Sequence, residues 1–277
     1  MMEFPNIDPT LVQIGPFAIR WYALAYIVSL LLGWRIARRL VRLGPAVATQ
    51  EHVDDFLTWA TLGVVLGGRL GYVLFYQPGH YLSHPLDALM VWQGGMSFHG
   101  GMLGVLVAMG AFCWKYGLSV RGFADRICVV APIGLGLGRC ANFINGELWG
   151  RAAPDWLRWG MTGFPNAGPG PRHPSQLYEA GMEGLMLLAV MALLCSRPGV
   201  RARFGTLSGV FLVGYGVARI VGEFFREPDA FLGFLYAGAT MGQMLSLPMI
   251  LAGVVLIAIA RPGVSPVAAS GANVGTA

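Results

Sequence analysis

Charged residues are scarce in this sequence, and their scarcity narrows the class of protein. Only 12% of the 277 residues are charged, whereas 55% are hydrophobic. That is about half the charge of an average soluble domain. A soluble core could not hold so many apolar residues, but a lipid bilayer could. The sequence therefore predicts a polytopic membrane protein with an all-α fold.

Several familiar site signatures are missing as well. The sequence has no HExxH, no aspartate cluster, no P-loop and no GxSxG elbow. Its four cysteines fall in apolar segments without CxxC spacing, which favours buried thiols. Basic residues bracket the apolar runs and form no stripe with interleaved aromatics, which argues against nucleic acid. We therefore expect no metal, no cofactor and no nucleic-acid partner.

A bilayer span needs about 20 mainly apolar residues. Seven segments meet this requirement. They cover roughly residues 17–38, 56–76, 98–114, 125–143, 176–195, 205–225 and a stretch within 230–260. Lys and Arg gather after the first, third, fifth and seventh segments, which the positive-inside rule assigns to the cytoplasm. The N-terminus is then outside and the C-terminus inside, with one transmembrane domain over 1–261 and a flexible tail over 262–277. With Glu3 and Asp8 near the start and no basic region, no cleaved signal peptide is expected.

Glycine spacing predicts where helices approach closely. Small residues four apart allow backbones to touch in lipid, and this pattern occurs at Gly63, Gly67 and Gly71, at Gly100 and Gly104, and at Gly134 and Gly138. The proline-rich segment 145–174 is too long for a tight turn. It fits either a mobile flap that admits substrate or a passive linker.

Three arginines, Arg69, Arg139 and Arg219, lie inside the expected spans. Each would cost about 2.5–3.5 kcal/mol at mid-bilayer, so each needs an anionic partner. In the nearby spans we count only Glu223, with Glu147 just outside one, so cations exceed protein anions. A negatively charged ligand is therefore implied, and phosphate matches the guanidinium fork best. The alternative is that these side chains only snorkel to the interface.

A polar ladder runs along the sixth span. Its members Tyr215, Arg219, Glu223 and Arg226 are spaced by four, four and three residues. At about 100° per residue they share an arc of roughly 80°. The ladder is expected to face the bundle interior, where Glu223 would hold one of the arginines in place.

Further polar candidates lie near the outer ends of other spans. His99 stands among glycines at the start of the third span, where an imidazole would suit proton transfer, although a structural role is the alternative. Asn142, about one helical turn beyond Arg139, is expected to orient the phosphate or that arginine, and Glu147 to anchor an arginine. Tyr22 would either bond a lipid headgroup or belong to the interfacial aromatic belt.

Three stretches carry a family resemblance: GRCANFINGELWG, SFHGG and YGVARIVGEFFREPD. Together they resemble the prolipoprotein diacylglyceryl transferase family of the bacterial inner membrane, and the likeness extends from about Arg20 to Arg261. The resemblance implies transfer of a diacylglyceryl group from phosphatidylglycerol to the lipobox cysteine of a prolipoprotein. A thioether forms and glycerol phosphate leaves, in a site toward the periplasm. By motif position, the residues that it implicates are Tyr22, His99, Arg139, Asn142, Glu147, Gly150 and Arg219, with Tyr215, Glu223 and Arg226 in the matching part of the sixth span.

The charged residues and the resemblance together imply the roles of three side chains in the transfer. Arg139 and Arg219 would stabilise the departing phosphate, and His99 is the hypothesised base for the substrate thiol. Two other classes stay open: a transporter or flippase of anionic substrates, and a non-catalytic lipid-binding scaffold. Against a transporter, the spans show no duplicated half. A scaffold would not need a histidine beside a cationic pocket.

Overall fold

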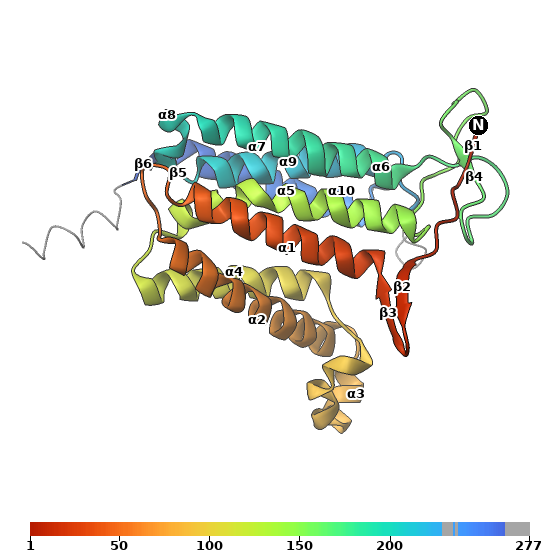
Figure 1. Ribbon diagram of the computed structural model, residues 1–277, viewed down its shortest axis with the longest axis horizontal. Coiled ribbons are helices and arrows are strands. Elements are labelled where there is room, and N and C mark those ends of the chain that lie inside the picture. Colours follow the sequence, from red (N-terminus) through yellow and green to blue (C-terminus); the bar gives the residue numbers. More distant parts are fainter. Residues whose placement is uncertain (229–234, 236–237, 264–277) are drawn as a thin grey trace, which may run out of the picture. The chain divides into compact units, whose positions relative to one another are not determined.

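The computed structural model describes residues 1–228, 235 and 238–263, and these are mostly helical (Figure 1). The chain divides into two compact units. The first unit contains Met1–Ala37 and Asp125–Gly263, and the second contains Arg38–Ala124. The helical fold expected from the composition is thus confirmed for the described residues.

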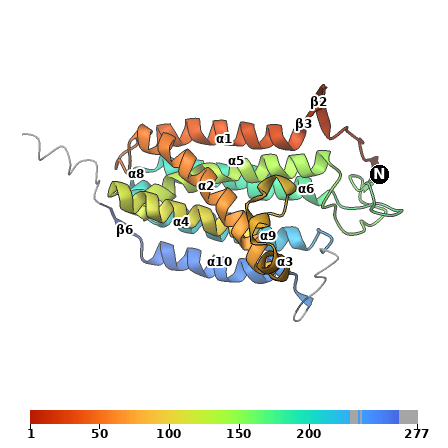
Figure 2. The same cartoon turned by 90° about the horizontal axis from the view of Figure 1, so that it is seen from below.

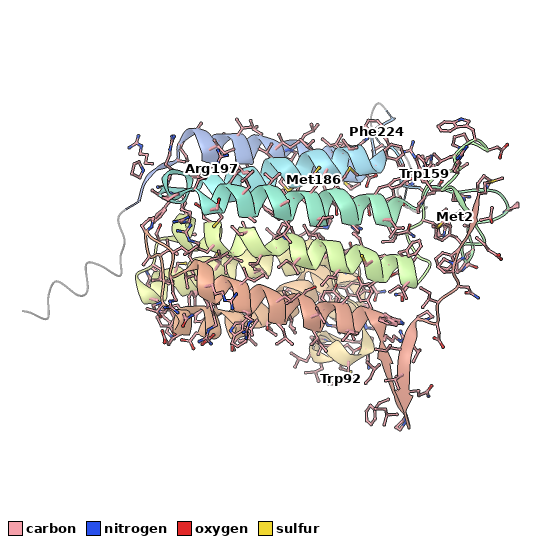
Figure 3. The ribbon with its side chains drawn as sticks, turned by 45° about the horizontal axis from the view of Figure 1, so that its top comes forward. Met2, Trp92, Trp159, Met186, Arg197 and Phe224 are labelled. Atoms are coloured by element: carbon pink, nitrogen blue, oxygen red, sulfur yellow. The ribbon has the colours of Figure 1, made fainter. Side chains whose placement is uncertain are left out.

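The first unit holds most of the long helices. Its elements are β1 (Met2–Glu3), β2 (Thr10–Ile14), β3 (Phe17–Arg20), α1 (Trp21–Leu40), α5 (Val120–Ile144), β4 (Met161–Thr162), α6 (Ser175–Glu179), the π-helix η3 (Ala180–Met186), α7 (Leu187–Ser196), α8 (Pro198–Arg201), β5 (Arg203–Phe204), α9 (Thr206–Glu223), α10 (Met241–Ala258) and β6 (Arg261–Pro262). Helix α9 lies beside α10 (Figure 2) and also contacts α7. Arg197 lies at one end of this unit, and Trp159 and Phe224 lie at the other (Figure 3).

A buried carboxylate fixes the start of α9. Asp125, at no measurable exposure, accepts hydrogen bonds from the backbone nitrogens of Gly205 at 2.8 Å and Ser208 at 2.7 Å. The Ser208 hydroxyl donates to the same carboxylate at 2.6 Å. Because the first N–H groups of a helix lack partners within it, Asp125 of α5 acts as their acceptor. This contact aligns α5 with α9, the two helices that carry Arg139 and Arg219.

The beginning of the chain departs from the prediction. Residues 17–20 were expected to open the first span, but they form β3, which pairs antiparallel with β2 through Gln13–Ala18 and Ile14–Phe17. Gly15 adopts a φ of 59° in the intervening turn, a conformation that glycine reaches without strain. Helix α1 therefore begins only at Trp21.

The second unit is a helical hairpin with an elaborate connection. Helix α2 (Gln50–Phe75) begins at a capping box between Thr49 and His52, earlier than the predicted span. The connection contains α3 (Pro78–Ser83) and two 3-10 turns, η1 (Pro85–Leu89) and η2 (Val91–Gln93). Helix α4 (Phe98–Tyr116) then starts at Ser97, whose hydroxyl accepts from the Gly100 nitrogen at 3.2 Å.

Close glycine packing joins α2 to α4, and it uses the glycines whose spacing predicted close helix contacts. A Cβ placed on Gly63 would lie 2.6 Å from the Gly104 carbonyl oxygen, and one on Gly71 would lie 2.8 Å from the Gly100 Cα. The matching prediction for α5 is wrong for Gly138, which has nothing within 4 Å of such a Cβ. In α5 the close contact involves Gly136, whose Cβ would lie 3.0 Å from the Gly184 Cα.

Within the described part of the chain, five helical segments are long and apolar enough to cross a membrane: α2, α4, α5, Ser175–Ser196 and α10. Only 11% of the apolar window of α10 is buried within the molecule, as expected for a helix that faces lipid. Helices α1 and α9 match the first and sixth predicted spans but fall outside this set. The count of seven spans therefore stays a prediction.

The segment 145–174 has a small core of its own. Phe4, Phe164 and Ala167 are buried together, and Phe143 and Trp149 pack against them. Strand β1 pairs with β4 through Met2–Met161. The segment is thus folded against the N-terminus. Most of the predicted tail (264–277), and the loop 229–237 apart from residue 235, lie outside the described residues.

Candidate active site

Arg139 of α5 and Arg219 of α9 belong to one ion-pair network. The Nη1 atom of Arg139 lies 3.1 Å from Glu179 Oε2, and the Arg219 Nη1 atom lies 2.7 Å from Glu179 Oε1. Arg139 also contacts Glu183 Oε2 through Nη2 at 3.0 Å and Nε at 3.1 Å. Two of the arginines predicted for the site are therefore brought together by carboxylates of a third helical segment.

The polar ladder of α9 joins the same network. Arg219 Nη2 pairs with Glu223 Oε1, one helical turn further on, as predicted. Arg226 Nη1 lies 3.9 Å from Glu179 Oε1. The Tyr215 phenol interacts electrostatically with Glu183, Arg219 and Arg139. The four ladder residues thus face one polar cluster.

The expected surplus of positive charge is wrong. Glu179, Glu183 and Glu223 together match the three guanidiniums of Arg139, Arg219 and Arg226 in formal charge. The prediction overlooked Glu179 and Glu183, which lie in the fifth predicted span. Their four-residue spacing was a usable signal, since it places both on one helix face. Pairing with carboxylates offsets much of the cost of burying these guanidiniums.

Exposure differs sharply between the two kinds of group. The side chains of Arg139 and Arg219 are each 15% exposed, whereas those of Glu179 and Glu183 are 0% exposed. Of these four side chains, only those of the two arginines are therefore partly accessible to a solute.

A π-helix supplies part of the network. Glu183 lies within η3, and π-helical turns are frequently found at functional sites. The adjacent Gly184 packs against Gly136 so tightly that a Cβ on Gly184 would lie 2.5 Å from the Gly136 Cα. This approach of backbones brings Glu183 to Arg139, which lies almost one helical turn beyond Gly136.

Glu147 has different partners from those expected. It was predicted to anchor an arginine, but its Oε1 atom accepts from Asn142 Nδ2 at 2.8 Å and Asn145 Nδ2 at 3.3 Å. In the described part of the chain no arginine pairs with it. Asn142 accordingly orients Glu147 and makes no hydrogen bond to Arg139 among these residues.

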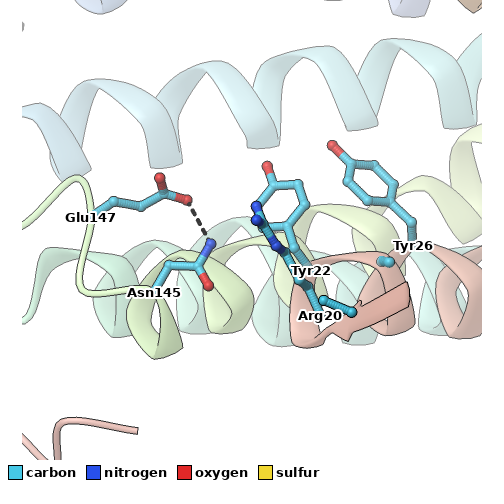
Figure 4. Close-up of a pocket in the computed structure, with 7 residues that line it drawn as sticks. Arg20, Tyr22, Tyr26, Asn145 and Glu147 are labelled. Atoms are coloured by element: carbon cyan, nitrogen blue, oxygen red, sulfur yellow. Dashed lines mark hydrogen bonds between the residues drawn. The ribbon is translucent and has the colours of Figure 1, made fainter. Parts of the chain in front are cut away.

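A cavity of about 600 Å³ adjoins Glu147 at the N-terminal end of α1. The Tyr22 and Tyr26 rings contact each other in a tilted arrangement, with 5.1 Å between their centroids, and both rings border this space (Figure 4). Its lining residues are Ala18, Arg20, Tyr22, Ala23, Tyr26, Asn145 and Glu147. One cation, one anion and two phenols therefore border a space large enough for a polar headgroup.

Gly150 and Arg151 contact the residues at the C-terminal end of α9. The Gly150 nitrogen donates to the His173 carbonyl at 3.0 Å, and a Cβ on Gly150 would lie 2.6 Å from the Phe225 carbonyl oxygen. Arg151 donates to the carbonyls of Arg226 at 2.9 Å and Glu223 at 3.0 Å. Glycine at 150 is thus needed for backbone packing, while its contact with substrate stays a prediction. The role of Arg151 was missed.

Two predicted residues belong to the second unit. His99 lies in the first turn of α4, with an exposed side chain. Arg69 was expected to need an anionic ligand or to snorkel, but its partners are backbone carbonyls, among them that of Gly94 at 2.5 Å. Neither residue is part of the network within the first unit.

Known proteins resemble the chain along most of its length. The family model described as prolipoprotein diacylglyceryl transferase matches residues 9–259. The phosphatidylglycerol–prolipoprotein diacylglyceryl transferase of Gluconacetobacter diazotrophicus is 65% identical over 258 residues, which is 93% of this chain and 92% of the relative. The enzyme of the same name from Gluconobacter oxydans is 63% identical, over 94% of this chain and 95% of the relative. The chain therefore belongs to the prolipoprotein diacylglyceryl transferase family.

Proposed function

We propose that this protein transfers the diacylglyceryl group of phosphatidylglycerol to the cysteine thiol of a prolipoprotein lipobox. The bond between the glyceryl carbon and the phosphate oxygen breaks, and a carbon–sulfur bond forms. The thiol proton passes to a base, and glycerol phosphate leaves with the bonding electron pair. The names of the close relatives state both substrates, phosphatidylglycerol and prolipoprotein.

The observation that carries this proposal is the exposure of Arg139 and Arg219 over fully buried carboxylates. A phosphodiester that enters the site meets guanidinium edges already oriented by Glu179 and Glu183. Donors fixed before the reaction need no reorganisation as charge develops on the leaving group. The roles of these arginines thus rest on preorganisation, since their net charge is balanced.

The cavity beside Tyr22 supports a second part of the proposal. The terminal glycerol of phosphatidylglycerol carries two hydroxyl groups, which need hydrogen-bond partners when they leave water. The Tyr22 hydroxyl and the Glu147 carboxylate border the cavity. We assign headgroup binding to these two residues, with Asn142 holding Glu147 in place.

His99 is the proposed base for the thiol. It is exposed in the first turn of α4, and a positioned imidazole contributes about 10²–10⁴-fold in proton transfer. His99→Gln should therefore lower the kcat of thioether formation by that order. His84→Gln, which changes another exposed histidine of the second unit, is the matched control. Near-full transfer by His99→Gln from pH 6 to pH 8 would remove this assignment.

We further propose a seven-span topology with the N-terminus periplasmic, the C-terminus cytoplasmic and the active site toward the periplasm of the bacterial inner membrane. The lengths of α1 and α9, which reach 20 and 18 residues, support the count. Arg197 at the end opposite Trp159 supports the orientation (Figure 3). Cysteine labelling from either side of the membrane would test it.

The activity itself has a direct test. Purified protein in phosphatidylglycerol vesicles is incubated with a lipobox peptide or with its Cys→Ser counterpart, and products are weighed by mass spectrometry. A thioether on the cysteine peptide alone is expected. Movement of lipid without product would instead support a transporter, and binding without either would support a scaffold.

A further inference from the structure

Arg69 is the centre of a hydrogen-bonded loop in the second unit. Its side chain leaves α2 near the C-terminal end of that helix and is buried, with 6% exposure. Nε donates to Ala88 O at 2.8 Å, Nη1 to Gly94 O at 2.5 Å and Gly95 O at 3.1 Å, and Nη2 to Asp87 O at 2.5 Å and Met90 O at 3.2 Å.

These contacts match the full capacity of the side chain. A guanidinium has five N–H donors in a fixed fork, and five hydrogen bonds end on five carbonyls of residues 87–95. The Tyr81 ring adds a cation–π contact, with its centroid 5.3 Å from the Arg69 Cζ. The charge is therefore held by carbonyl dipoles and an aromatic face. All five donors of Arg69 are occupied, so none is left to bind a phosphate. The contacts of Arg139 to Glu179 and Glu183 use three of its five donors, so the roles of the two arginines differ.

The loop that Arg69 holds leads directly into α4. Gly95, whose carbonyl Arg69 binds, precedes His99 by only four residues. Between them, the Ser97 nitrogen donates to the carbonyl of Gly68, the neighbour of Arg69 in α2, at 2.8 Å. Two consecutive residues of α2 thus determine where the loop ends and where α4 begins.

Gly95 of the loop packs tightly against side chains of α2. Gly95 has a φ of 76°, and a Cβ there would lie 2.6 Å from the Tyr72 ring and 2.9 Å from Arg69 Nη1. A side chain at 95 is therefore strained and collides with the groups that anchor the loop. Changes at 69 and at 95 should disturb the same contact by independent means.

We propose that Arg69 is a positioning residue for the transfer reaction. By holding the carbonyls of residues 87–95, it fixes the first turn of α4 and so the place at which His99 is presented. Arg69 itself touches no substrate in this account. The inference rests on the proposed role of His99 as base. Because a shift of about 1 Å can lower a rate about 10²-fold, loss of the guanidinium should be visible in kcat.

The test combines kinetics with hydrogen exchange on full-length protein in phosphatidylglycerol vesicles. Arg69→Ala, Arg69→Lys and Gly95→Ala are compared with Arg38→Ala, which removes a partly exposed pair with Asp54 near the start of α2. Arg69→Ala and Gly95→Ala should lower kcat about 100-fold, with the KM for phosphatidylglycerol changed less than about threefold. Amide exchange should accelerate over 85–97 and stay unchanged in the second half of α4. Arg69→Lys, with three donors instead of five, should fall between.

A double variant separates this inference from the role of His99. In a His99→Gln background, Arg69→Ala should cause little further loss, because residues that act as a unit are not additive. Independent, additive losses would overturn the inference, as would full activity of Arg69→Ala or unchanged exchange over 85–97. Should Arg69→Ala fail to fold, Arg69→Lys and Gly95→Ala carry the same comparison. Full activity of His99→Gln alone would instead count against the base, and the exchange data would still report on the loop.

Discussion

Arg139 and Arg219 lie on different helices and share one carboxylate, with Glu179 Oε2 3.1 Å from Arg139 and Oε1 2.7 Å from Arg219. A bridging carboxylate sets the distance between two guanidiniums more tightly than two separate pairs would, because one rigid group fixes both. The spacing of the proposed phosphate-binding groups therefore depends on Glu179, the last residue of α6.

Removal of this bridge should affect both rate and stability. Glu179→Gln keeps the shape of the side chain but leaves two buried guanidiniums with less compensation. Breaking a buried pair typically destabilises a protein by about 3–5 kcal/mol, and the thioether rate should fall about 10²-fold. The rate of transfer and the thermal midpoint are measured in the same vesicles. An unchanged kcat in folded Glu179→Gln would show that the bridge does not set the geometry of the site.

The contact between Gly136 and Gly184 offers a second prediction with an internal control. A Cβ at 184 would lie 2.5 Å from the Gly136 Cα, whereas one at 138 would meet nothing within 4 Å. Gly184→Ala should therefore push η3 away from α5 and separate Glu183 from Arg139. The kcat should fall at least about tenfold as a result. Gly138→Ala should leave kcat unchanged, because its Cβ occupies open space. Equal behaviour of the two variants in the thioether assay would refute the packing argument.

The stability of the segment 145–174 should depend on pH through His173. Partial burial lowers the pKa of this imidazole, whose Nδ1 lies 3.3 Å from the Tyr178 hydroxyl. The folded state then binds fewer protons than the unfolded state, in which the pKa is about 6.5. Stability should thus hold above about pH 6.5 and decline as the pH falls from there toward the lowered folded value. His173→Gln should flatten this part of the curve when thermal midpoints are recorded between pH 5 and pH 8, and an unaltered slope would exclude His173 as its source.

Much of the fold could be predicted from the sequence because it depends on local patterns. The apolar runs indicated the helices. The spacing of Gly63, Gly67 and Gly71 indicated a close helix contact without naming the partner, and the spacing of Arg219 and Glu223 indicated their pairing. These are periodicities of one helix, which sequence records directly.

The rest depends on contacts between distant segments. Glu179 and Glu183 were missed as partners of the arginines, although their own spacing was visible, because nothing local indicates which helix they face. The carbonyl contacts of Arg69 require a loop conformation that composition does not specify. The π-helix and the amide partners of Glu147 have no known sequence signature of that kind either.

We propose that the guanidiniums of Arg139 and Arg219 bind the lipid phosphate and stabilise its departure. The most direct measurement is the rate of thioether formation by Arg139→Ala and Arg219→Ala, with Arg121→Ala, at an exposed position of the second unit, as the control. Both variants should lose at least 10²-fold in kcat/KM for phosphatidylglycerol, and the control should lose none. Transfer at the wild-type rate by either folded variant would contradict it.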